Sequence, residues 1–147
     1  MKRIIISTIL AFALMLSNCN AGNPDNTAKG IVHLTTAEFK LKVFNYDVNK
    51  QWKYEGTKPA IVDFYADWCG PCRRLAPIIE QVSKEYGDQI VIYKVDTDKE
   101  QELAQSLGIQ SLPTLLFIPV KGQPQAALGL QPKENIDKII KELLLTK

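Results

Sequence analysis

Residues 31–147 alternate between short, mostly apolar runs and longer stretches in which apolar residues recur every three or four positions. The short runs predict buried strands, and the recurring positions predict helices that turn one face toward a core. Strands are expected at 31–34, 60–66, 90–95, 114–118 and 125–128. Helices are expected at 35–43, 69–86, 98–107 and 132–144.

The order of these elements predicts an α/β fold. A strand–helix–strand portion precedes a β-hairpin with its turn at 120–124, and a terminal helix follows. This order builds one central mixed β-sheet flanked by helices on both faces. The apolar stripe of the last helix belongs to the core in this interpretation.

Local signals predict where the helices begin and end. Thr35 and Glu38 form a capping box for the first helix, which is expected to run through Phe39, Leu41 and Val43. Asp98 with Gln101 is expected to cap the third helix, and Gly108 to end it. Pro132 is expected at the first position of the last helix.

The N-terminal segment has the pattern of an export signal. Lys2 and Arg3 precede an apolar run from Ile4 to Leu16, which is too short to span a bilayer comfortably. We therefore divide the chain into a signal peptide (1–19), a flexible tether (20–30) and a single domain (31–147). The same two cations account for the net charge of +2, so the rest of the chain is balanced and gives no reason to expect nucleic acid as a partner.

Two ends of the signal are compatible with the sequence. Residues 16–19 (Leu-Ser-Asn-Cys) resemble a lipobox, in which cleavage before Cys19 leaves a lipidated cysteine. Cleavage after Ala21 is the alternative, and it would remove Cys19. We favour the first, which predicts a membrane-anchored lipoprotein. Either way, the protein is expected outside the cytoplasm, in the periplasm or elsewhere in a bacterial envelope.

Two cysteines provide the most specific chemical signal. Cys69 and Cys72 lie where a buried strand passes into a helix, so Cys69 is placed at the helix N-terminus and Cys72 one turn inside. Unpaired N–H groups and the helix dipole favour a thiolate at Cys69. A structural disulfide remains possible, although so short a loop would remove little unfolded-state entropy. A zinc site would need about four ligands, and only His33 and Cys19 remain as further His or Cys, so no metal and no cofactor is expected.

Around these cysteines the sequence resembles the thioredoxin family. Residues 68–72 (Trp-Cys-Gly-Pro-Cys) match the family's active-site motif, and the similarity covers about residues 30–145. Asp63, Lys94, Leu112-Pro113-Thr114 and Gly129 match further family positions in order. The resemblance implies a thioredoxin-like fold.

The resemblance also implies a role for each residue. Cys69 would be the nucleophile, Cys72 the resolving thiol and Asp63 a buried proton acceptor supported by Lys94. The substrate groove would comprise Trp68, Gly70, Pro71, Leu112, Pro113 and Gly129, with a cis bond before Pro113.

The function expected from these residues is thiol–disulfide exchange that reduces protein disulfides. By resemblance, Gly-Pro between the cysteines goes with reducing family members. An envelope oxidase or isomerase is the alternative, and a non-redox client-binding module is a further one. Disulfide-bonded proteins and an unidentified electron donor are the expected partners of a monomer.

One segment departs from the family pattern. Residues 45–58 make the stretch between Phe39 and Asp63 about ten residues longer than in a minimal thioredoxin, and they include Tyr46, Trp52 and Tyr54. We expect a longer first helix and a loop whose aromatic residues pack on the edge of the domain. An accessory surface for a specific partner is the alternative.

Overall fold

The computed structural model describes residues 30–146, which form one five-stranded sheet with helices on both faces. The elements, in chain order, are β1 (Ile31–His33), α1 (Thr36–Lys42), β2 (Ala60–Tyr65), α2 (Gly70–Tyr86), β3 (Val91–Asp96), α3 (Gln101–Ser106), β4 (Thr114–Ile118), β5 (Gln125–Leu128), α4 (Lys133–Ile139) and the π-helix η1 (Ile140–Leu144). The proposed signal peptide, Cys19 and most of the tether lie outside the described residues.

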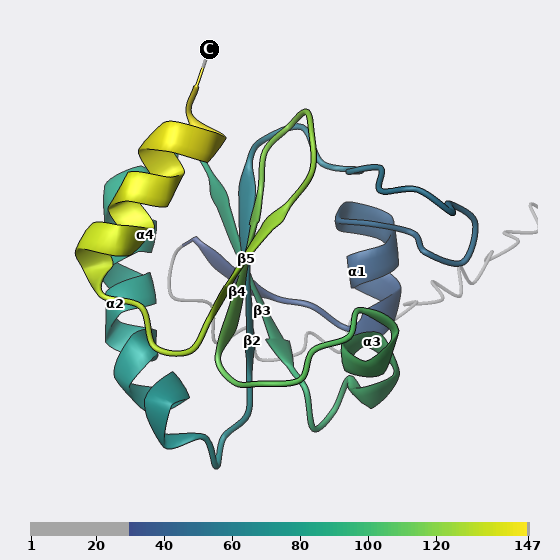
Figure 1. Ribbon diagram of the computed structural model, residues 1–147, viewed down its shortest axis with the longest axis horizontal. Coiled ribbons are helices and arrows are strands. Elements are labelled where there is room, and N and C mark those ends of the chain that lie inside the picture. The colour runs from purple at the N-terminus through teal and green to yellow at the C-terminus, as the bar shows by residue number, and fades with distance from the viewer. Residues whose placement is uncertain (1–29, 147) are drawn as a thin grey trace, which may run out of the picture.

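The sheet has the strand order β1-β3-β2-β4-β5. Strands β1, β3 and β2 are parallel, whereas β4 pairs antiparallel with both β2 and β5. In Figure 1, α1 and α3 lie on one side of the sheet and α2 and α4 lie on the other. The mixed sheet with two covered faces, predicted from the element order, is therefore confirmed.

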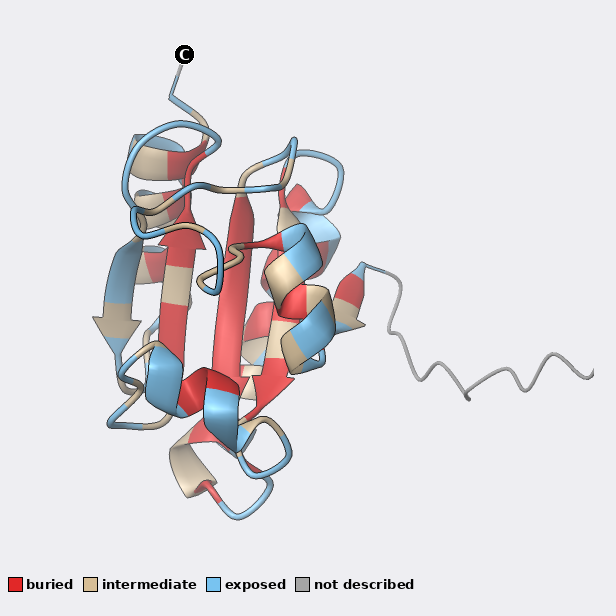
Figure 2. Cartoon of the chain, turned by 90° about the vertical axis from the view of Figure 1, so that its right-hand side faces the viewer, coloured by how far each residue is buried: buried red, intermediate tan, exposed pale blue. Residues whose placement is uncertain are grey.

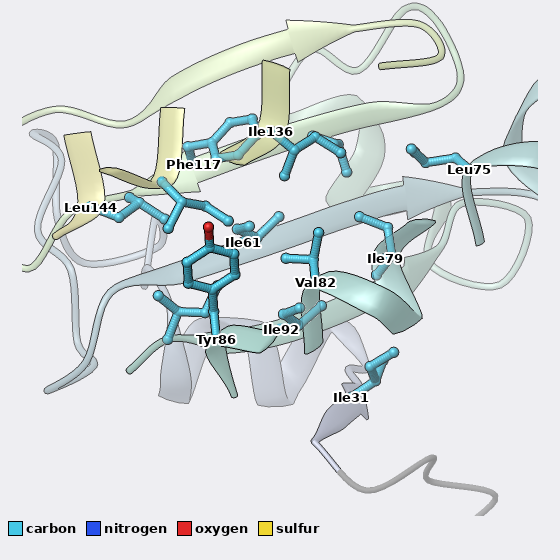
Figure 3. Close-up of a cluster of buried hydrophobic side chains, with 13 residues drawn as sticks. Ile31, Ile61, Leu75, Ile79, Val82, Tyr86, Ile92, Phe117, Ile136 and Leu144 are labelled. Atoms are coloured by element: carbon cyan, nitrogen blue, oxygen red, sulfur yellow. The ribbon is translucent and has the colours of Figure 1, made fainter. Parts of the chain in front are cut away.

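Each face of the sheet buries its own apolar cluster. Between the sheet and the α2–α4 layer, residues of α2 such as Leu75 and Ile79 meet Ile136 of α4 over Ile61 and Phe117 (Figure 3). The apolar stripe of the last helix is thus core, as predicted. On the opposite face, Phe39, Phe64 and Leu103 belong to a second cluster under α1 and α3.

The first helix is shorter than expected. The capping box of Thr35 and Glu38 is present, but α1 ends at Lys42, so the prediction of a longer first helix is wrong. Phe39 and Val43 are buried, whereas Leu41 is 75% exposed. Residues two positions apart lie on different sides of a helix, so Leu41 cannot share the buried side of the other two.

Two other predicted helix starts also need correction. Glu100, not Asp98, occupies the N-cap position of α3, and it makes no side-chain cap bond there. Its carboxylate instead accepts hydrogen bonds from the backbone N–H and hydroxyl of Thr36, at 2.7 and 2.6 Å, and so joins α3 to the start of α1. Pro132 is the N-cap of α4 rather than its first helical residue.

The segment 45–58 is a loop in the structure. Its Tyr46, Trp52 and Tyr54, together with Phe44, pack against the α1–α3 cluster, as the sequence predicted for the aromatic residues. The ring centroids of Phe44 and Trp52 are 4.8 Å apart, and those of Phe44 and Tyr46 are 6.4 Å apart. This packing gives the loop a defined place against the domain.

Candidate active site

The two motif cysteines lie at the start of α2, just beyond the end of β2. Cys69 is the N-cap residue of the helix, and its Sγ accepts a hydrogen bond from the backbone N–H of Cys72 at 3.2 Å. The two residues are joined by a disulfide with a Cα–Cα distance of 5.2 Å. The position of Cys69 predicted from the sequence is therefore confirmed, and the Cys72 N–H of the first helical turn is placed to stabilise a thiolate there.

Burial does not distinguish the two cysteines in this oxidised form. Cys69 is 4% exposed and Cys72 is 6% exposed, so both residues are almost fully buried. What separates them is their place on the helix, because Cys69 precedes the first turn and Cys72 lies within it. The neighbouring Trp68 is 69% exposed and forms an apolar surface beside the pair.

A second loop reaches the cysteines from the other end of the chain. Leu112 packs against the small cluster formed by Ala66, Cys69 and Cys72, and the Leu112–Pro113 bond is cis, as the resemblance implied. The backbone N–H of Gly129 donates to the carbonyl of Pro113 at 2.8 Å. The fold thus brings Leu112 against the cysteines and joins Gly129 to the next residue of the same loop, Pro113.

Asp63 is a buried carboxylate in the middle of β2. It is 1% exposed, and its Oδ2 accepts a 2.6 Å hydrogen bond from Nζ of Lys94, which faces it across the parallel β2–β3 pair. Its other oxygen, Oδ1, is buried and accepts no hydrogen bond from the residues that the structure describes. The pairing of Asp63 with Lys94 was implied by the resemblance and is present.

The surroundings of Asp63 favour its neutral form. Burial raises the pKa of the Asp63 carboxyl, while the Lys94 ammonium and, more weakly, His33 act in the opposite direction. Lys94 Nζ also lies 4.3 Å from the centroid of the Tyr65 ring. A carboxylate whose pKa is raised in this way is suited to accept a proton during thiol chemistry.

Two polar contacts at the rim were not predicted. The indole N–H of Trp68 donates to Oδ2 of Asp98 at 2.9 Å, which gives Asp98 a role at the site instead of at the start of α3. Arg73 donates from Nη1 to the carbonyl of Asp67 at 2.9 Å. The Trp68–Asp98 contact joins residues 30 positions apart, so no local sequence pattern indicates it.

Within residues 30–146, no group of three or more His, Cys, Asp or Glu side chains is arranged to hold a metal ion. No helix in this part of the chain is long and apolar enough to cross a membrane. The groups with chemistry in the described site are the two sulfur atoms at the start of α2 and the buried Asp63 carboxyl in β2, the strand that leads to them.

Comparison with known proteins agrees with this geometry. The family model described as Thioredoxin matches residues 31–142. A thioredoxin of Borreliella burgdorferi is 50% identical over 111 residues, which are 76% of this chain and 95% of that protein. A thioredoxin of Alicyclobacillus acidocaldarius is 36% identical over 98 residues, which are 67% of this chain and 93% of that protein.

A solved structure has the same fold. The crystal structure of chloroplastic thioredoxin z superposes with a TM-score of 0.65 at 28% identity, and the match covers 79% of this chain and 96% of that one. The chain therefore belongs to the thioredoxin family. The enzyme class that follows is a thioredoxin-like disulfide reductase.

Proposed function

We propose that this chain reduces disulfide bonds of client proteins through its Cys69/Cys72 dithiol. The observation that carries the proposal is the Cys69–Cys72 pair at the N-terminus of α2, with Leu112 of the cis-proline loop packed against it. A disulfide that formed only to staple the fold would need no such loop beside it. The thioredoxin relatives support the same activity.

The two cysteines have different roles in this proposal. The Cys69 thiolate, favoured by the helix N-terminus, attacks one sulfur of the client disulfide and releases the other as a thiolate. A mixed disulfide between Cys69 and the client results. Cys72 then attacks Sγ of Cys69, which releases the second client thiolate and leaves the Cys69–Cys72 disulfide. The client gains two electrons, and the protein loses two.

Asp63 serves the second step as the proton acceptor for Cys72. Its buried position and raised pKa support this role, because the carboxyl can hold the proton that Cys72 must lose before it attacks. Lys94 supports Asp63 by donating to Oδ2, which leaves Oδ1 for the proton.

The client backbone lies in a groove beside the sulfur atoms in this proposal. Trp68 forms one wall, Gly70 and Pro71 form the start of α2, and Leu112, Pro113 and Gly129 form the opposite side. The hydrogen bond from Gly129 N–H to the carbonyl of Pro113 supports this grouping, because it holds the two loops together. The partners are disulfide-bonded proteins and an electron donor that is still to be identified, and the protein acts as a monomer.

Reduction of insulin disulfides with dithiothreitol as the electron donor tests the proposed activity. The described domain is expected to accelerate the precipitation of the insulin B chain, because it passes electrons from dithiothreitol to the insulin disulfides. A client-binding module without redox chemistry would leave the rate at that of dithiothreitol alone. The double variant Cys69→Ser/Cys72→Ser is the matched control and should not accelerate the reaction.

We further propose that the protein is exported and anchored by lipid. Lys2 and Arg3, the apolar run from Ile4 to Leu16, and Cys19 support this location. Residues 1–19 would carry the signal, and cleavage before Cys19 would leave that residue to bear the lipid. Residues 20–30 would be the tether, and 31–147 the catalytic domain in the periplasm or at the membrane surface of a bacterial envelope.

Metabolic labelling with palmitate in a bacterial host tests the lipid anchor. Wild-type protein should become labelled, and Cys19→Ala should not, because it removes the thiol that receives the lipid. An unlabelled mature wild-type chain beginning at Gly22 would instead establish ordinary cleavage after Ala21. The variant Ser17→Ala controls for changes near the signal and should still be labelled.

A further inference from the structure

The structure contains an uncharged cleft beside the proposed groove, built in part by the 45–58 loop. It has a volume of about 310 Å³ and is lined by Trp52, residues 107–111, and residues of β4 and β5. Not one of its lining side chains is charged. We call it the Trp52 cleft. Its volume lies at the lower end of the range for ligand sites, so it fits side chains rather than a large cofactor.

The floor of the cleft is one face of the β4–β5 hairpin. Thr114 pairs with Leu128 and Leu116 pairs with Ala126, so these four side chains lie on the same side of the two antiparallel strands. Strand β5 is the outer strand of the sheet, and Figure 2 shows its mostly exposed surface at the left-hand edge. Leu128 is 65% exposed. An apolar floor at the open edge of a sheet is accessible to another chain.

Trp52 forms a wall of the cleft, and the aromatic rings of Phe44 and Tyr46 pack to support it. Its ring lies 4.8 Å from that of Phe44, and Phe44 in turn contacts Tyr46. Nζ of Lys40 lies 4.5 Å from the centre of the Tyr46 ring and forms a 2.8 Å ion pair with Asp47. The wall therefore comes from the segment that lengthens this chain relative to a minimal thioredoxin, and it is fixed in place by packing.

Two chain segments lead from the cleft toward the redox site. Ser111 lines the cleft, and the next residue, Leu112, packs against Cys69 and Cys72. Leu128 also lines it, and the next residue, Gly129, donates its N–H to Pro113. A client strand that crosses the cis-proline loop can therefore continue over the hairpin and into the cleft.

We propose that the Trp52 cleft binds one apolar side chain of the client, a few residues from the cysteine under attack. The occupant is uncharged because no lining residue offers a charge to pair with one, and burying an unpaired charge is costly. The inference rests on the proposed disulfide reduction and adds to it a preference for the sequence around the client disulfide. A second copy of this chain is the competing occupant.

The test uses reduced protein and synthetic peptide disulfides in single-turnover experiments. One peptide carries a single Leu in a background of Ser and Gly, and the Leu is moved from one to six residues on either side of the cysteine. One position should be reduced about tenfold faster than its Ser counterpart, the effect of burying one apolar side chain. Asp at that position should bring no increase.

Charged substitutions on β5 test whether the preference for Leu in the peptide depends on the Trp52 cleft. Ala126 is exposed and lines the cleft, so Ala126→Glu should abolish the increase for Leu without loss of packing. Gln125→Glu is the matched control, because Gln125 is exposed on the same strand with its side chain on the opposite face, and it should keep the increase. Ala126→Lys should reverse the preference from Leu to Asp, a gain that a misfolded protein cannot produce.

Hydroxyethyl disulfide, which is too small to reach the cleft, separates the two proposals. The wild type and the variants Ala126→Glu, Gln125→Glu and Ala126→Lys should reduce it at equal rates. If the wild type does not reduce it at all, the proposed function and this inference are both overturned. Equal hydroxyethyl disulfide reduction without a position effect for Leu would overturn the cleft alone. Faster reduction of the Leu peptide by Ala126→Glu as well would also overturn the cleft proposal. So would sedimentation that shows dimers of the wild type and monomers of Ala126→Glu, because a second copy of the chain would then occupy the cleft.

Discussion

Cys72→Ser is expected to accumulate mixed disulfides with its protein substrates, whereas Cys69→Ser is expected to form none. Cys69 is the N-cap of α2, where the helix N–H groups favour a thiolate, and Cys72 lies within the first turn. Attack by Cys69 therefore comes first, and only Cys72 is placed to resolve the adduct quickly. Both variants should lose turnover by on the order of a thousandfold or more, as removal of a nucleophile generally does.

Mass spectrometry after exposure to a disulfide-bonded protein distinguishes the two variants. The Cys72→Ser adduct should have the mass of protein plus client and should dissolve on addition of a reductant. Because both cysteines are equally buried in the oxidised form, this experiment tests the assignment by helix position alone. Adducts on Cys69→Ser with none on Cys72→Ser would reverse the roles.

Asp63→Asn is expected to stabilise the oxidised protein at neutral pH by on the order of 1 kcal/mol, because a raised folded pKa means that the charged carboxylate costs free energy on folding. Burial raises the pKa of Asp63 above its value in the unfolded chain, despite the nearby Lys94. The folded state therefore binds the proton more tightly. The contribution of Asp63 to stability is therefore fully present below the unfolded pKa and is lost as pH rises through the folded pKa.

Denaturant unfolding of the oxidised proteins between pH 4 and pH 8 measures this dependence without interference from free thiols. The stability gained by Asp63→Asn should increase with pH and then level off. Asp88→Asn, the same change at an exposed position, should have little effect at any pH. A constant difference across the range would mean that Asp63 does not titrate with a raised pKa.

Asp63→Asn also separates the two chemical steps, which are attack by Cys69 and release of the mixed disulfide by Cys72. Attack by Cys69 should be nearly unchanged in Asp63→Asn, while release of the mixed disulfide should slow by roughly a hundredfold, the lower end of general-base contributions. Rapid-quench analysis of the adduct measures both rates. Unchanged release would remove Asp63 from the mechanism and leave its buried position as a structural feature.

Features encoded by neighbouring residues were predictable from the sequence. The capping box needs only Thr35 and Glu38, and the hairpin needs two apolar runs around the 120–124 turn, so both appear as predicted. The Cys69 position also follows from a strand meeting a helix. The thioredoxin resemblance added the Asp63–Lys94 pair and the cis bond before Pro113, which spacing alone does not indicate.

Features that depend on distant residues were not predictable in this way. The residues next to Asp98 in the sequence predict a helix cap. In the structure, however, its side chain accepts a hydrogen bond from the indole N–H of Trp68, 30 positions away. Glu100 reaches Thr36 across 64 positions. The wall of the Trp52 cleft depends on how a loop packs against residues 107–111, which no local pattern describes.

The reduction potential of the Cys69–Cys72 couple decides whether the protein reduces or forms disulfide bonds. Equilibration with glutathione buffers of known ratio, followed by mass spectrometry of alkylated thiols, gives the value. We expect a reducing couple with a potential close to the general value for thioredoxin, about −270 mV. A potential of about −120 mV, typical of strong disulfide oxidants, would instead identify the protein as an oxidase.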